Sequence, residues 1–368
     1  MSRISVSHVW KIYEGNVIAV KDASFTCEDQ EFLGIVGPSG SGKSSMLRMI
    51  TGLEEVTRGE ISFDGKLVNN LTPAERNVAL AFESYALYPR LTVYENIAFP
   101  LRAKGVSKPE VDKMVKSIAE DLELTDILDK RPSAVSGGHQ QRVSLGRALV
   151  RKPSVTLLDE PISHMDQRVR LEIRARIRRI HDDLRSTTIF VTHDQADAIA
   201  LCDRLAVLNN AELEQVGTVS EIWNQPANRF VASFIGEPPM NYINAKVEDP
   251  QHVSILTKEG KRTFEFKGEV DQKFVGSEKV TLGVRPQEIT VLPSKRKEAS
   301  IAGTVRVIEF QGASRVLKVG LEDRDNAEVK VVVPMEIAGH VEDAVWLEFS
   351  PETIHLFDKD TPIIRRAG

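Results

Sequence analysis

The stretch Gly37-Pro-Ser-Gly-Ser-Gly-Lys-Ser44 decides the fold of the first part of this 368-residue chain. It follows an apolar run that ends at Val36 and precedes a helical pattern over residues 45–50, so a strand, a glycine-rich loop and a helix occur in that order. Glycines allow backbone N–H groups to converge on phosphate oxygens, and the N-terminus of the following helix adds positive potential. The sequence therefore predicts a loop that holds the phosphates of a nucleoside triphosphate.

Two side chains of this loop have defined chemical roles. The Lys43 ammonium is long enough to reach the terminal phosphates, and the Ser44 hydroxyl can ligate Mg²⁺. A chance match to the pattern is rare in a chain of this composition, which disfavours the alternative of a glycine-rich turn without function. We therefore expect ATP and Mg²⁺ as ligands, and the residues predicted to hold them are Gly37, Pro38, Ser39, Gly40, Ser41, Gly42, Lys43, Ser44 and Ser45.

A pair of acidic residues accompanies the loop. Residues 155–159 have the pattern of a buried strand, and Glu160 follows directly. In phosphoryl transfer one carboxylate at such a position holds the metal ion, while the next orients and deprotonates the attacking water. We assign the first role to Asp159, together with Ser44, and the second to Glu160. Taken alone, a strand that ends in two acidic residues is equally compatible with a structural role, and the phosphate loop favours the catalytic one.

The first 235 residues alternate short apolar runs with amphipathic helical patterns, which predicts an α/β fold with a mainly parallel sheet covered by helices. The expected strands include residues 32–36, 78–82, 155–159 and 188–192. The expected helices, which are apolar along one face, include residues 43–51, 109–123 and 168–185.

This pattern stops at Gly236-Glu-Pro-Pro-Met240, because consecutive prolines cannot continue a helix or pair inside a sheet. We therefore predict a domain of residues 1–235 and a second domain of residues 236–368. In the second domain the apolar runs are short and separated by Gly, Pro, Asp and Asn, which predicts an all-β barrel or pair of barrels. The strands expected there are residues 253–257, 263–267, 279–284, 304–310, 315–321, 328–333 and 345–349.

Composition and charge disfavour several classes of protein. A net charge of −5 gives no basic field for a nucleic-acid backbone, and we predict that the arginine-rich stretch 168–185 is a solvated helix face. The two cysteines, Cys27 and Cys202, lack the spacing of a zinc site or a disulfide framework, and His164 and His181 lack metal-ligand spacing. Because no signal sequence or apolar run of membrane-spanning length occurs, we expect neither export nor membrane insertion.

A third motif, Ser136-Gly-Gly-His-Gln-Gln-Arg142, lies between the phosphate loop and the strand that ends at Asp159. A serine hydroxyl and two glycine N–H groups at the start of a helix form an anion site, although an ordinary helix cap is the alternative. Together with the Leu-Leu-Asp-Glu-Pro sequence around Glu160, this motif resembles the signature of ATP-binding-cassette (ABC) ATPases, which have a P-loop NTPase core. The resemblance implies that Ser136, Gly137 and Gly138 close on ATP held by the opposite subunit of a head-to-tail dimer.

Further residues follow in the order of that family. Tyr13 resembles the aromatic residue that stacks on adenine, although a core aromatic is the alternative. The resemblance implies that Asp166, in Ser-His-Met-Asp, contacts the other subunit, and that His193, in Val-Thr-His-Asp, contacts the γ-phosphate. It also implies a helical subdomain over about residues 85–153 that grips a transmembrane subunit. The implied catalytic residues are Glu160 and His193.

One departure from the family pattern concerns Glu83, because the family normally has Gln at this position. The resemblance implies that this residue contacts Mg²⁺ and water and senses the membrane partner. Glu keeps the side-chain length but adds a negative charge beside the phosphates, which weakens nucleotide binding unless Mg²⁺ compensates. We hypothesise an active but kinetically altered site, in a chain that pairs with a non-identical ATPase carrying Gln. His139, where the family usually has Gln, is a smaller departure.

Three stretches indicate the branch of the family. Residues 84–101, 282–288 and 350–358 are similar to ATPase subunits of maltose-type, trehalose-type and glycerol-3-phosphate-type importers, whose C-terminal domain consists of paired OB-like barrels. The resemblance implies an ATPase at the cytoplasmic face of a bacterial inner membrane that drives import of a sugar, polyol or glycerol-type solute. It implies as partners a second ATPase subunit, two transmembrane permease subunits and, indirectly, a periplasmic solute-binding protein. We interpret the C-terminal domain as dimerising and regulatory.

The sequence alone leaves two alternative functions to consider. Glu83 alone motivates a catalytically weakened or regulatory half of a heterodimeric importer. A non-transport ABC ATPase that acts on DNA or ribosomes would carry long coiled-coil insertions, zinc-binding cysteines or two tandem cassettes, and this sequence has none of these features.

Overall fold

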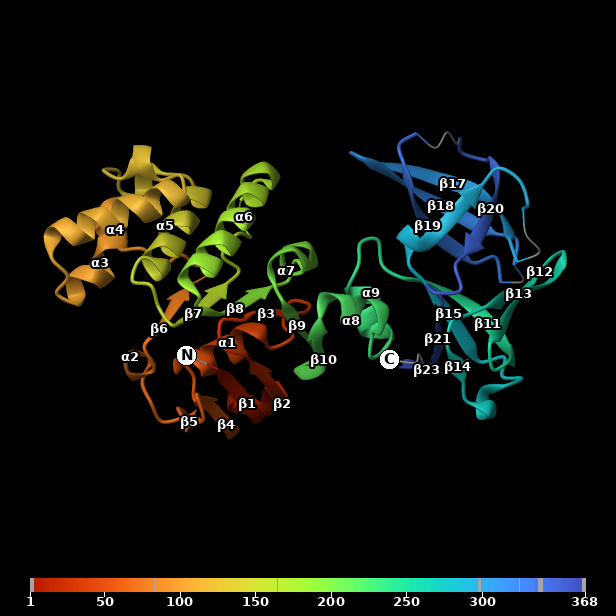
Figure 1. Cartoon of the computed structure of the whole chain (residues 1–368), viewed down its shortest axis with the longest axis horizontal. Helices are drawn as coiled ribbons and strands as arrows, with labels where there is room; N and C mark the ends of the chain where they lie inside the picture. The colour runs from red at the N-terminus through yellow and green to blue at the C-terminus, as the bar shows by residue number, and fades with distance from the viewer. Residues whose placement is uncertain are drawn as a thin grey trace. The chain divides into compact units, whose positions relative to one another are not determined.

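The chain forms two compact units in the computed structural model, which describes residues 3–82, 84–163, 165–296, 299–323, 325–336 and 340–365. The first unit is Met1–Val219 and the second is Ser220–Gly368. Figure 1 draws the first unit from red to green and the second from green to blue. The prolines that prompted the predicted boundary, Pro238 and Pro239, lie inside the second unit.

The first unit is built on one large sheet. Its strands are β1 (Ile4–Tyr13), β2 (Val17–Cys27), β3 (Phe32–Val36), β4 (Arg58–Phe63), β5 (Lys66–Leu67), β6 (Val78–Ala81), β7 (Val155–Asp159), β8 (Thr187–Thr192), β9 (Arg204–Asn209) and β10 (Glu212–Thr218). They follow the order β5-β4-β1-β2-β10-β9-β3-β8-β7-β6. The strands β6, β7, β8, β3 and β9 pair in parallel, whereas β5, β4, β1 and β2 pair antiparallel. The parallel strands bring their carboxyl ends to one edge of the sheet.

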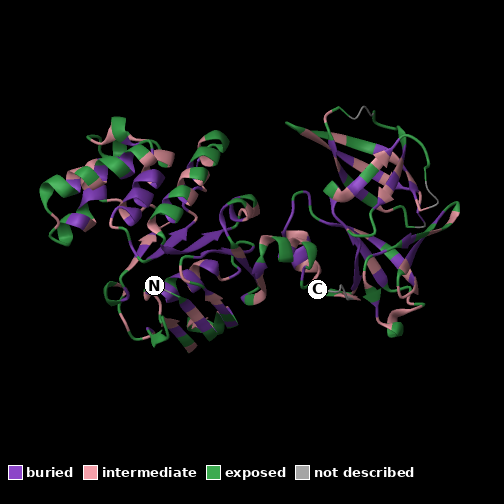
Figure 2. Ribbon diagram, in the orientation of Figure 1, coloured by how far each residue is buried: buried purple, intermediate pink, exposed green. Residues whose placement is uncertain are grey.

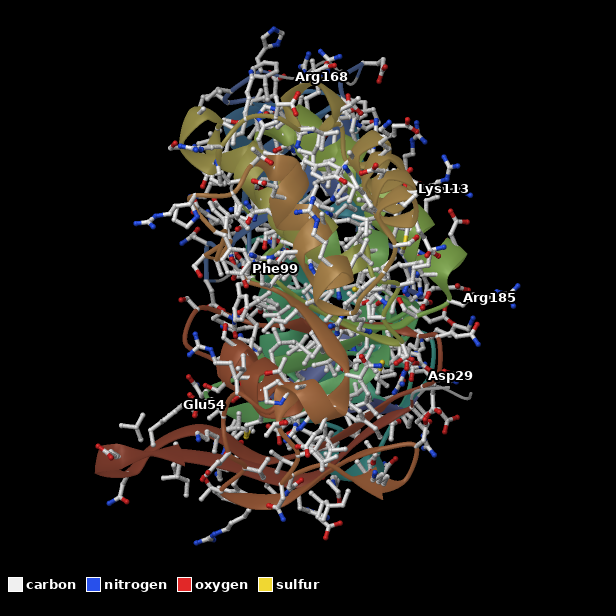
Figure 3. The ribbon with its side chains drawn as sticks, turned by 90° about the vertical axis from the view of Figure 1, so that its left-hand side faces the viewer. Asp29, Glu54, Phe99, Lys113, Arg168 and Arg185 are labelled. Atoms are coloured by element: carbon white, nitrogen blue, oxygen red, sulfur yellow. The ribbon has the colours of Figure 1, made fainter. Side chains whose placement is uncertain are left out.

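The helices of the first unit connect these strands. They are α1 (Lys43–Thr51), α2 (Pro73–Arg76), α3 (Val93–Ala103), α4 (Lys108–Asp121), α5 (Gly137–Leu149), α6 (Gln167–Leu184) and α7 (Gln195–Leu201). Short 3₁₀ turns occur at Glu14–Asn16, Thr125–Ile127 and Pro132–Ala134. Helices α3, α4 and α5 group together in Figure 1, and Figure 3 shows Phe99 of α3 and Lys113 of α4 on the outside of this group. Over the described ranges, none of the helices has the length and apolar character needed to span a bilayer.

The core of the first unit lies where α1 packs on the sheet. Strand β3 is buried along its whole length, as the purple centre of the sheet in Figure 2 shows. On α1 the side chains of Met46, Leu47, Met49 and Ile50 are buried among β1, β2, β7 and β8. Because α1 is fixed by this apolar contact, the loop that precedes it is held at the carboxyl edge of the parallel strands.

Over its described residues, the second unit is all-β apart from two short helices and two 3₁₀ turns. Helices α8 (Val219–Asn224) and α9 (Arg229–Phe234) precede the strands β11 (Asn241–Asp249), β12 (His252–Thr257), β13 (Gly260–Glu265), β14 (Glu269–Val270), β15 (Val280–Val284), β16 (Ile289–Leu292), β17 (Ile301–Gln311), β18 (Ser314–Leu321), β19 (Glu328–Pro334), β20 (Ala344–Phe349), β21 (His355–Asp358), β22 (Thr361–Pro362) and β23 (Ile364–Arg365). The 3₁₀ turns are Gln272–Phe274 and Pro286–Glu288. The strands form sheets of order β13-β12-β11-β15-β21-β22 and β16-β20-β17-β18-β19, plus the pair β14-β23.

The fold class predicted from the sequence is confirmed in both halves of the chain. The helices expected at residues 43–51, 109–123 and 168–185 correspond to α1, α4 and α6. The expected strand at residues 263–267 begins earlier, because β12 and β13 form a hairpin that turns at residues 258–259. The prediction missed β11, since its alternating pattern follows directly on the proline-rich stretch that indicated a loop.

The buried Arg285 connects the two helices of the second unit to its strands. Its guanidinium donates to the carbonyl oxygens of Trp223 at 2.8 Å and Ala232 at 3.3 Å, and to that of Ile235. It also lies 3.9 Å from the centroid of the Trp223 ring. Burial lowers the pKa of Arg285 to about 10, so the side chain stays charged at neutral pH. Gly236, with φ of 123°, leaves room for it, because a Cβ there would lie 2.8 Å from Arg285 Nη1.

We expect the substitution Arg285→Met to lower the free energy of unfolding of the second unit by ~3 kcal/mol. The reason is that each buried carbonyl left without a donor costs about 1–3 kcal/mol, which the apolar contacts of methionine only partly offset. Urea unfolding followed by tryptophan fluorescence measures this in a Trp10→Phe background, in which Trp223 and Trp346 of the second unit are the remaining tryptophans. The control is Arg306→Met, because Arg306 is exposed and its ion pair with Glu342 spans 3.3 Å at the surface. Equal stability of the two variants would contradict the prediction.

Candidate nucleotide site

The glycine-rich loop runs from β3 to α1 in the order that the sequence predicts. At Gly42, the residue before α1, φ is 103°, and a Cβ would lie 2.1 Å from the carbonyl oxygen of Ala19 in β2. Only glycine fits this conformation and this close approach. The loop can therefore lie directly against β2 while α1 starts at Lys43, and the first N–H groups of a helix lie beyond its own hydrogen-bond ladder.

Lys43 and Ser41 are buried inside the loop. Lys43 is only 6% exposed, and its ammonium donates to the carbonyl oxygens of Gly37 at 2.9 Å and Pro38 at 2.8 Å. Ser41 is 2% exposed, and its hydroxyl makes no hydrogen bond with any residue that the structure describes. A buried ammonium bound to backbone carbonyls and a buried hydroxyl without a partner among the described residues are donor groups expected of an anion site.

A cavity of about 260 Å³ opens at this loop. Its walls come from the loop, from β2 and from the residues that follow β7 and β8, namely Ala19, Ser39, Gly40, Gly42, Lys43, Ser44, Ser45, Glu160 and His193. Beside it, the Ser44 hydroxyl lies 3.4 Å from Asp159 Oδ1. Hydroxyl and carboxylate oxygens are the ligands that Mg²⁺ prefers, so these residues fit the metal that the sequence predicts.

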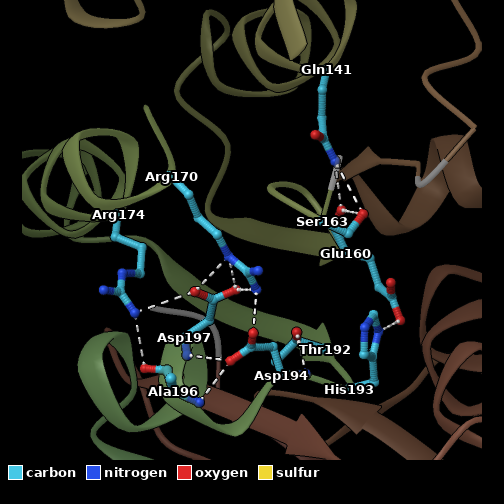
Figure 4. A network of polar contacts seen from close by, with 10 residues as sticks. All are labelled: Gln141, Glu160, Ser163, Arg170, Arg174, Thr192, His193, Asp194, Ala196 and Asp197. Atoms are coloured by element: carbon cyan, nitrogen blue, oxygen red, sulfur yellow. Dashed lines mark hydrogen bonds and ion pairs between the residues drawn. The ribbon is translucent and has the colours of Figure 1, made fainter. Parts of the chain in front are cut away.

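Glu160 and His193 meet at the rim of this cavity (Figure 4). His193 Nδ1 lies 2.7 Å from Glu160 Oε1. The Glu160 side chain is 15% exposed and that of His193 is 55% exposed, so the carboxylate is the more enclosed partner. Glu160 has left-handed backbone with φ of 46°, and its N–H donates to the carbonyl oxygen of Val191 at 2.9 Å. This conformation turns the chain out of β7 and presents the carboxylate at the edge of the sheet.

Gln141 belongs to the site although its function was not predicted. Its side-chain amide is almost fully buried and donates at 2.8 Å to the carbonyl oxygen of Glu160, which also accepts from the Ser163 hydroxyl at 3.1 Å. These bonds connect the start of α5 to the turn that carries Glu160 (Figure 4). The sequence signal for Gln141 was its place in the Ser136 motif, but its contact with Glu160 requires that α5 pack beside β7.

Tyr13, predicted to stack on adenine, is the last residue of β1. Its hydroxyl lies 3.2 Å from that of Ser45, so the ring is held close to the start of α1. The Lys11 ammonium lies 4.8 Å from the ring centroid. Tyr13 is half-buried and is therefore not a residue of the hydrophobic core. A role in adenine binding stays a prediction.

The residues predicted to face a second subunit lie at helix starts outside the cavity lining. Ser136 caps α5, and its hydroxyl lies 2.6 Å from His139 Nδ1, while Gly137 and Gly138 form the first turn. Burial, Arg142 and Lys130 lower the pKa of His139, so its neutral ring can accept a hydrogen bond from the Ser136 hydroxyl. Ser136, Gly137 and Asp166 are exposed.

Asp166 caps α6, because its carboxylate accepts from the Val169 N–H at 3.1 Å. Among the residues predicted for the site, Glu83 lies outside the described residues, and so does His164 in the loop that precedes Asp166.

Residues 20–163 match the family model of the ABC transporter domain, and residues 282–357 match that of the TOBE domain. A dimeric ATP-binding cassette solved in a post-hydrolysis state with ADP and Pi has a TM-score of 0.55 at 31% identity and covers 58% of this chain and 98% of its own. Its match is confined to part of the chain, as expected for a cassette without a second unit. The fold and the loop define an ATP-binding-cassette ATPase with a P-loop core.

Three relatives are similar to this chain over most of its length, including the second unit. The sn-glycerol-3-phosphate import ATP-binding protein UgpC of Cupriavidus necator is 41% identical over 367 residues, 98% of both chains. The trehalose/maltose import ATP-binding protein MalK of Thermococcus litoralis is 41% identical over 378 residues, 98% of this chain and 99% of its own. The maltose/maltodextrin MalK of Yersinia pestis is 44% identical over 314 residues, 85% of this chain and 84% of its own. The chain therefore belongs to the family of ABC import ATP-binding proteins.

Proposed function

We propose that this chain hydrolyses ATP to drive import of a sugar, a polyol or a glycerol-phosphate-type solute through a membrane permease. The observation that carries the proposal is the cavity in which Lys43 and Ser44 face the Glu160–His193 pair. The names of the relatives, which are import ATP-binding proteins for glycerol-3-phosphate, trehalose and maltose, support the solute class.

In this proposal each group has one role in binding or hydrolysis. Lys43 exchanges its bonds to the loop carbonyls for bonds to the terminal phosphates, and the N–H groups at the start of α1 bind further phosphate oxygens. Glu160 takes a proton from the attacking water, and His193 holds the Glu160 carboxylate on one side and the γ-phosphate on the other. Mg²⁺, held by Ser44 and Asp159, supplies positive charge that neutralises the phosphate oxygens.

The proposed assembly contains two ATPase subunits and two permease subunits at the cytoplasmic face of a bacterial inner membrane, supplied by a periplasmic solute-binding protein. The exposed Ser136 and Gly137 then bind ATP held by the other ATPase subunit, with Asp166 across the same interface. The dimer described for the related cassette supports this arrangement. ATP drives closure because it binds the closed dimer more tightly than the open one.

Deletion of the gene tests the transport function. We expect it to abolish uptake of one solute out of a panel of radiolabelled maltose, trehalose, sugar alcohols and sn-glycerol-3-phosphate. Expression of the unaltered chain should restore that uptake, whereas expression of Glu160→Gln should not. Unchanged uptake of every solute in the panel, with ATPase activity intact in the purified chain, would instead support a non-transport ABC ATPase.

For Glu83, which the structure does not describe, we expect Glu83→Gln to tighten ATP binding about fivefold. Removal of one negative charge near the phosphates relieves a repulsion of ~1 kcal/mol. Titration of the purified chain with a fluorescent ATP analogue at fixed Mg²⁺ measures the change, with Glu110→Gln on the exposed side of α4 as control. If affinity and turnover of the homodimer are unaffected, the hypothesis of a weakened half-site in a heterodimer is wrong.

A further inference from the structure

Four charged side chains beside the catalytic pair have no role in the function proposed above. Arg170 and Arg174 project from the first half of α6, and Asp194 and Asp197 lie at the start of α7 (Figure 4). Asp194 directly follows His193 in the chain. The cluster therefore lies between the helix that begins at the dimer-facing Asp166 and the turn that carries the histidine.

Arg170 binds both acidic residues at once. Its Nη2 lies 2.8 Å from Asp194 Oδ2, and its Nε lies 3.0 Å from each carboxylate oxygen of Asp197. Arg174 adds weaker contacts, because its Nη1 lies 3.3 Å from Asp197 Oδ1 and 3.2 Å from the carbonyl oxygen of Ala196. Only the planar, forked guanidinium of Arg170 connects the two carboxylates.

The two oxygens of Asp194 have different partners. Oδ1 accepts the N–H groups of Ala196 at 2.8 Å and Asp197 at 3.1 Å, which caps α7, whereas Oδ2 binds Arg170. The Asp194 N–H in turn donates to the Thr192 hydroxyl at 3.0 Å. The backbone on the C-terminal side of His193 is thus bonded to β8, to α7 and, through Arg170, to α6.

Asp197 and Asp194 differ in whether a second arginine contacts them. Asp197 is 1% exposed, and burial raises the pKa of its carboxyl group while the ion pair with Arg170 opposes that shift. Arg174 can still partner Asp197 if Arg170 is removed, but it has no contact with Asp194 among the described interactions. Among the described interactions, the bond between Arg170 and Asp194 is therefore the direct one between α6 and the residue after His193, whereas Arg174 contacts only α7.

We propose that Arg170 is a positioning residue for ATP hydrolysis, which holds the turn of His193 against helix α6 and so keeps the imidazole in contact with Glu160. The inference rests on the proposed roles of Glu160 and His193. Because Asp166 caps the same helix, one turn before Arg170, a shift of α6 when the other subunit binds would move the histidine with it.

The test is Arg170→Met in the full-length chain. We expect kcat for ATP to fall by ~10- to ~100-fold, the range for a misplacement of about 1 Å, while KM for ATP stays within about twofold because the phosphate loop is intact. Arg178→Met is the matched control, since Arg178 is on the same helix and pairs with Asp182 and Asp203, away from the site. Its kcat should equal that of the unaltered chain.

Two further variants distinguish an effect on the position of His193 from an effect on the stability of the fold. Asp194→Asn keeps an N-cap for α7 but loses the charge that binds Arg170, so kcat should fall while the melting temperature hardly changes. The double variant Arg170→Met/Asp197→Asn removes the buried carboxylate that Arg170→Met leaves short of a partner, so it should recover the melting temperature but not kcat.

Recovery of kcat together with the melting temperature in the double variant, or an unchanged kcat in Arg170→Met, would overturn the inference. The proposed function fails separately, if Glu160→Gln hydrolyses ATP at the unaltered rate.

Discussion

Replacement of Glu160 by glutamine is expected to slow ATP hydrolysis by a factor of ~10²–10⁴, the usual contribution of a general base. The amide has the size of the carboxylate and can still hydrogen-bond the ring of His193, which lies 2.7 Å away, but it cannot accept a proton from water. ATP binding should be preserved, since the phosphate loop does not depend on this charge. Phosphate release and equilibrium nucleotide binding, measured on the same preparation, separate the two quantities.

The matched control is Glu172→Gln. Glu172 is exposed on α6 and pairs with Arg168 at 3.5 Å, so this variant makes the same chemical change at a surface ion pair. Turnover within about twofold of normal is expected for the control. Comparable activity of the Glu160 and Glu172 variants would remove Glu160 from the mechanism.

The variant Lys43→Met is expected to lose ATP affinity by ~2–5 kcal/mol, which is roughly 30-fold to several-thousand-fold in Kd. Lys43 is buried, so its ammonium reaches the phosphates in an enclosed environment where the interaction is stronger than in water. Isothermal titration with ATP in the presence of Mg²⁺ measures the loss.

Lys113→Met controls for the loss of a lysine, because Lys113 is exposed on α4 and points outward in Figure 3. Circular dichroism must accompany the titration, since methionine leaves the carbonyl oxygens of Gly37 and Pro38 without their donor. A folded Lys43→Met variant with normal ATP affinity would refute the assignment of the loop.

The parts of the site that follow one another in the chain were predictable. Lys43 and Ser44 lie in the loop, and Glu160 directly follows a strand, so local spacing alone indicated their chemistry. The resemblance implied a contact of His193 with the γ-phosphate but not its contact with Glu160, which arises because β7 and β8 are neighbouring parallel strands.

The ion-pair partners of the arginines of α6 could not all be predicted from local sequence spacing. Pairs four residues apart, such as Arg178 and Asp182, are typical of a solvated helix face, and the whole stretch was interpreted that way. For Arg170 and Arg174 that interpretation is wrong, because both pair with Asp197, which is buried. A partner 27 residues further along the chain is brought into reach only when α7 packs beside α6.

The hydrogen bonds of Arg285 limit the positions at which two such chains can be joined into a hybrid protein. Its acceptors, on Trp223, Ala232 and Ile235, all precede the prolines, whereas the arginine itself comes at the end of β15. A hybrid protein spliced at Gly236 would inherit the arginine from one parent and its carbonyl acceptors from the other. A splice at Ser220 keeps donor and acceptors in one inherited piece, so helices α8 and α9 should be exchanged with the strands of the second unit and not with the first unit.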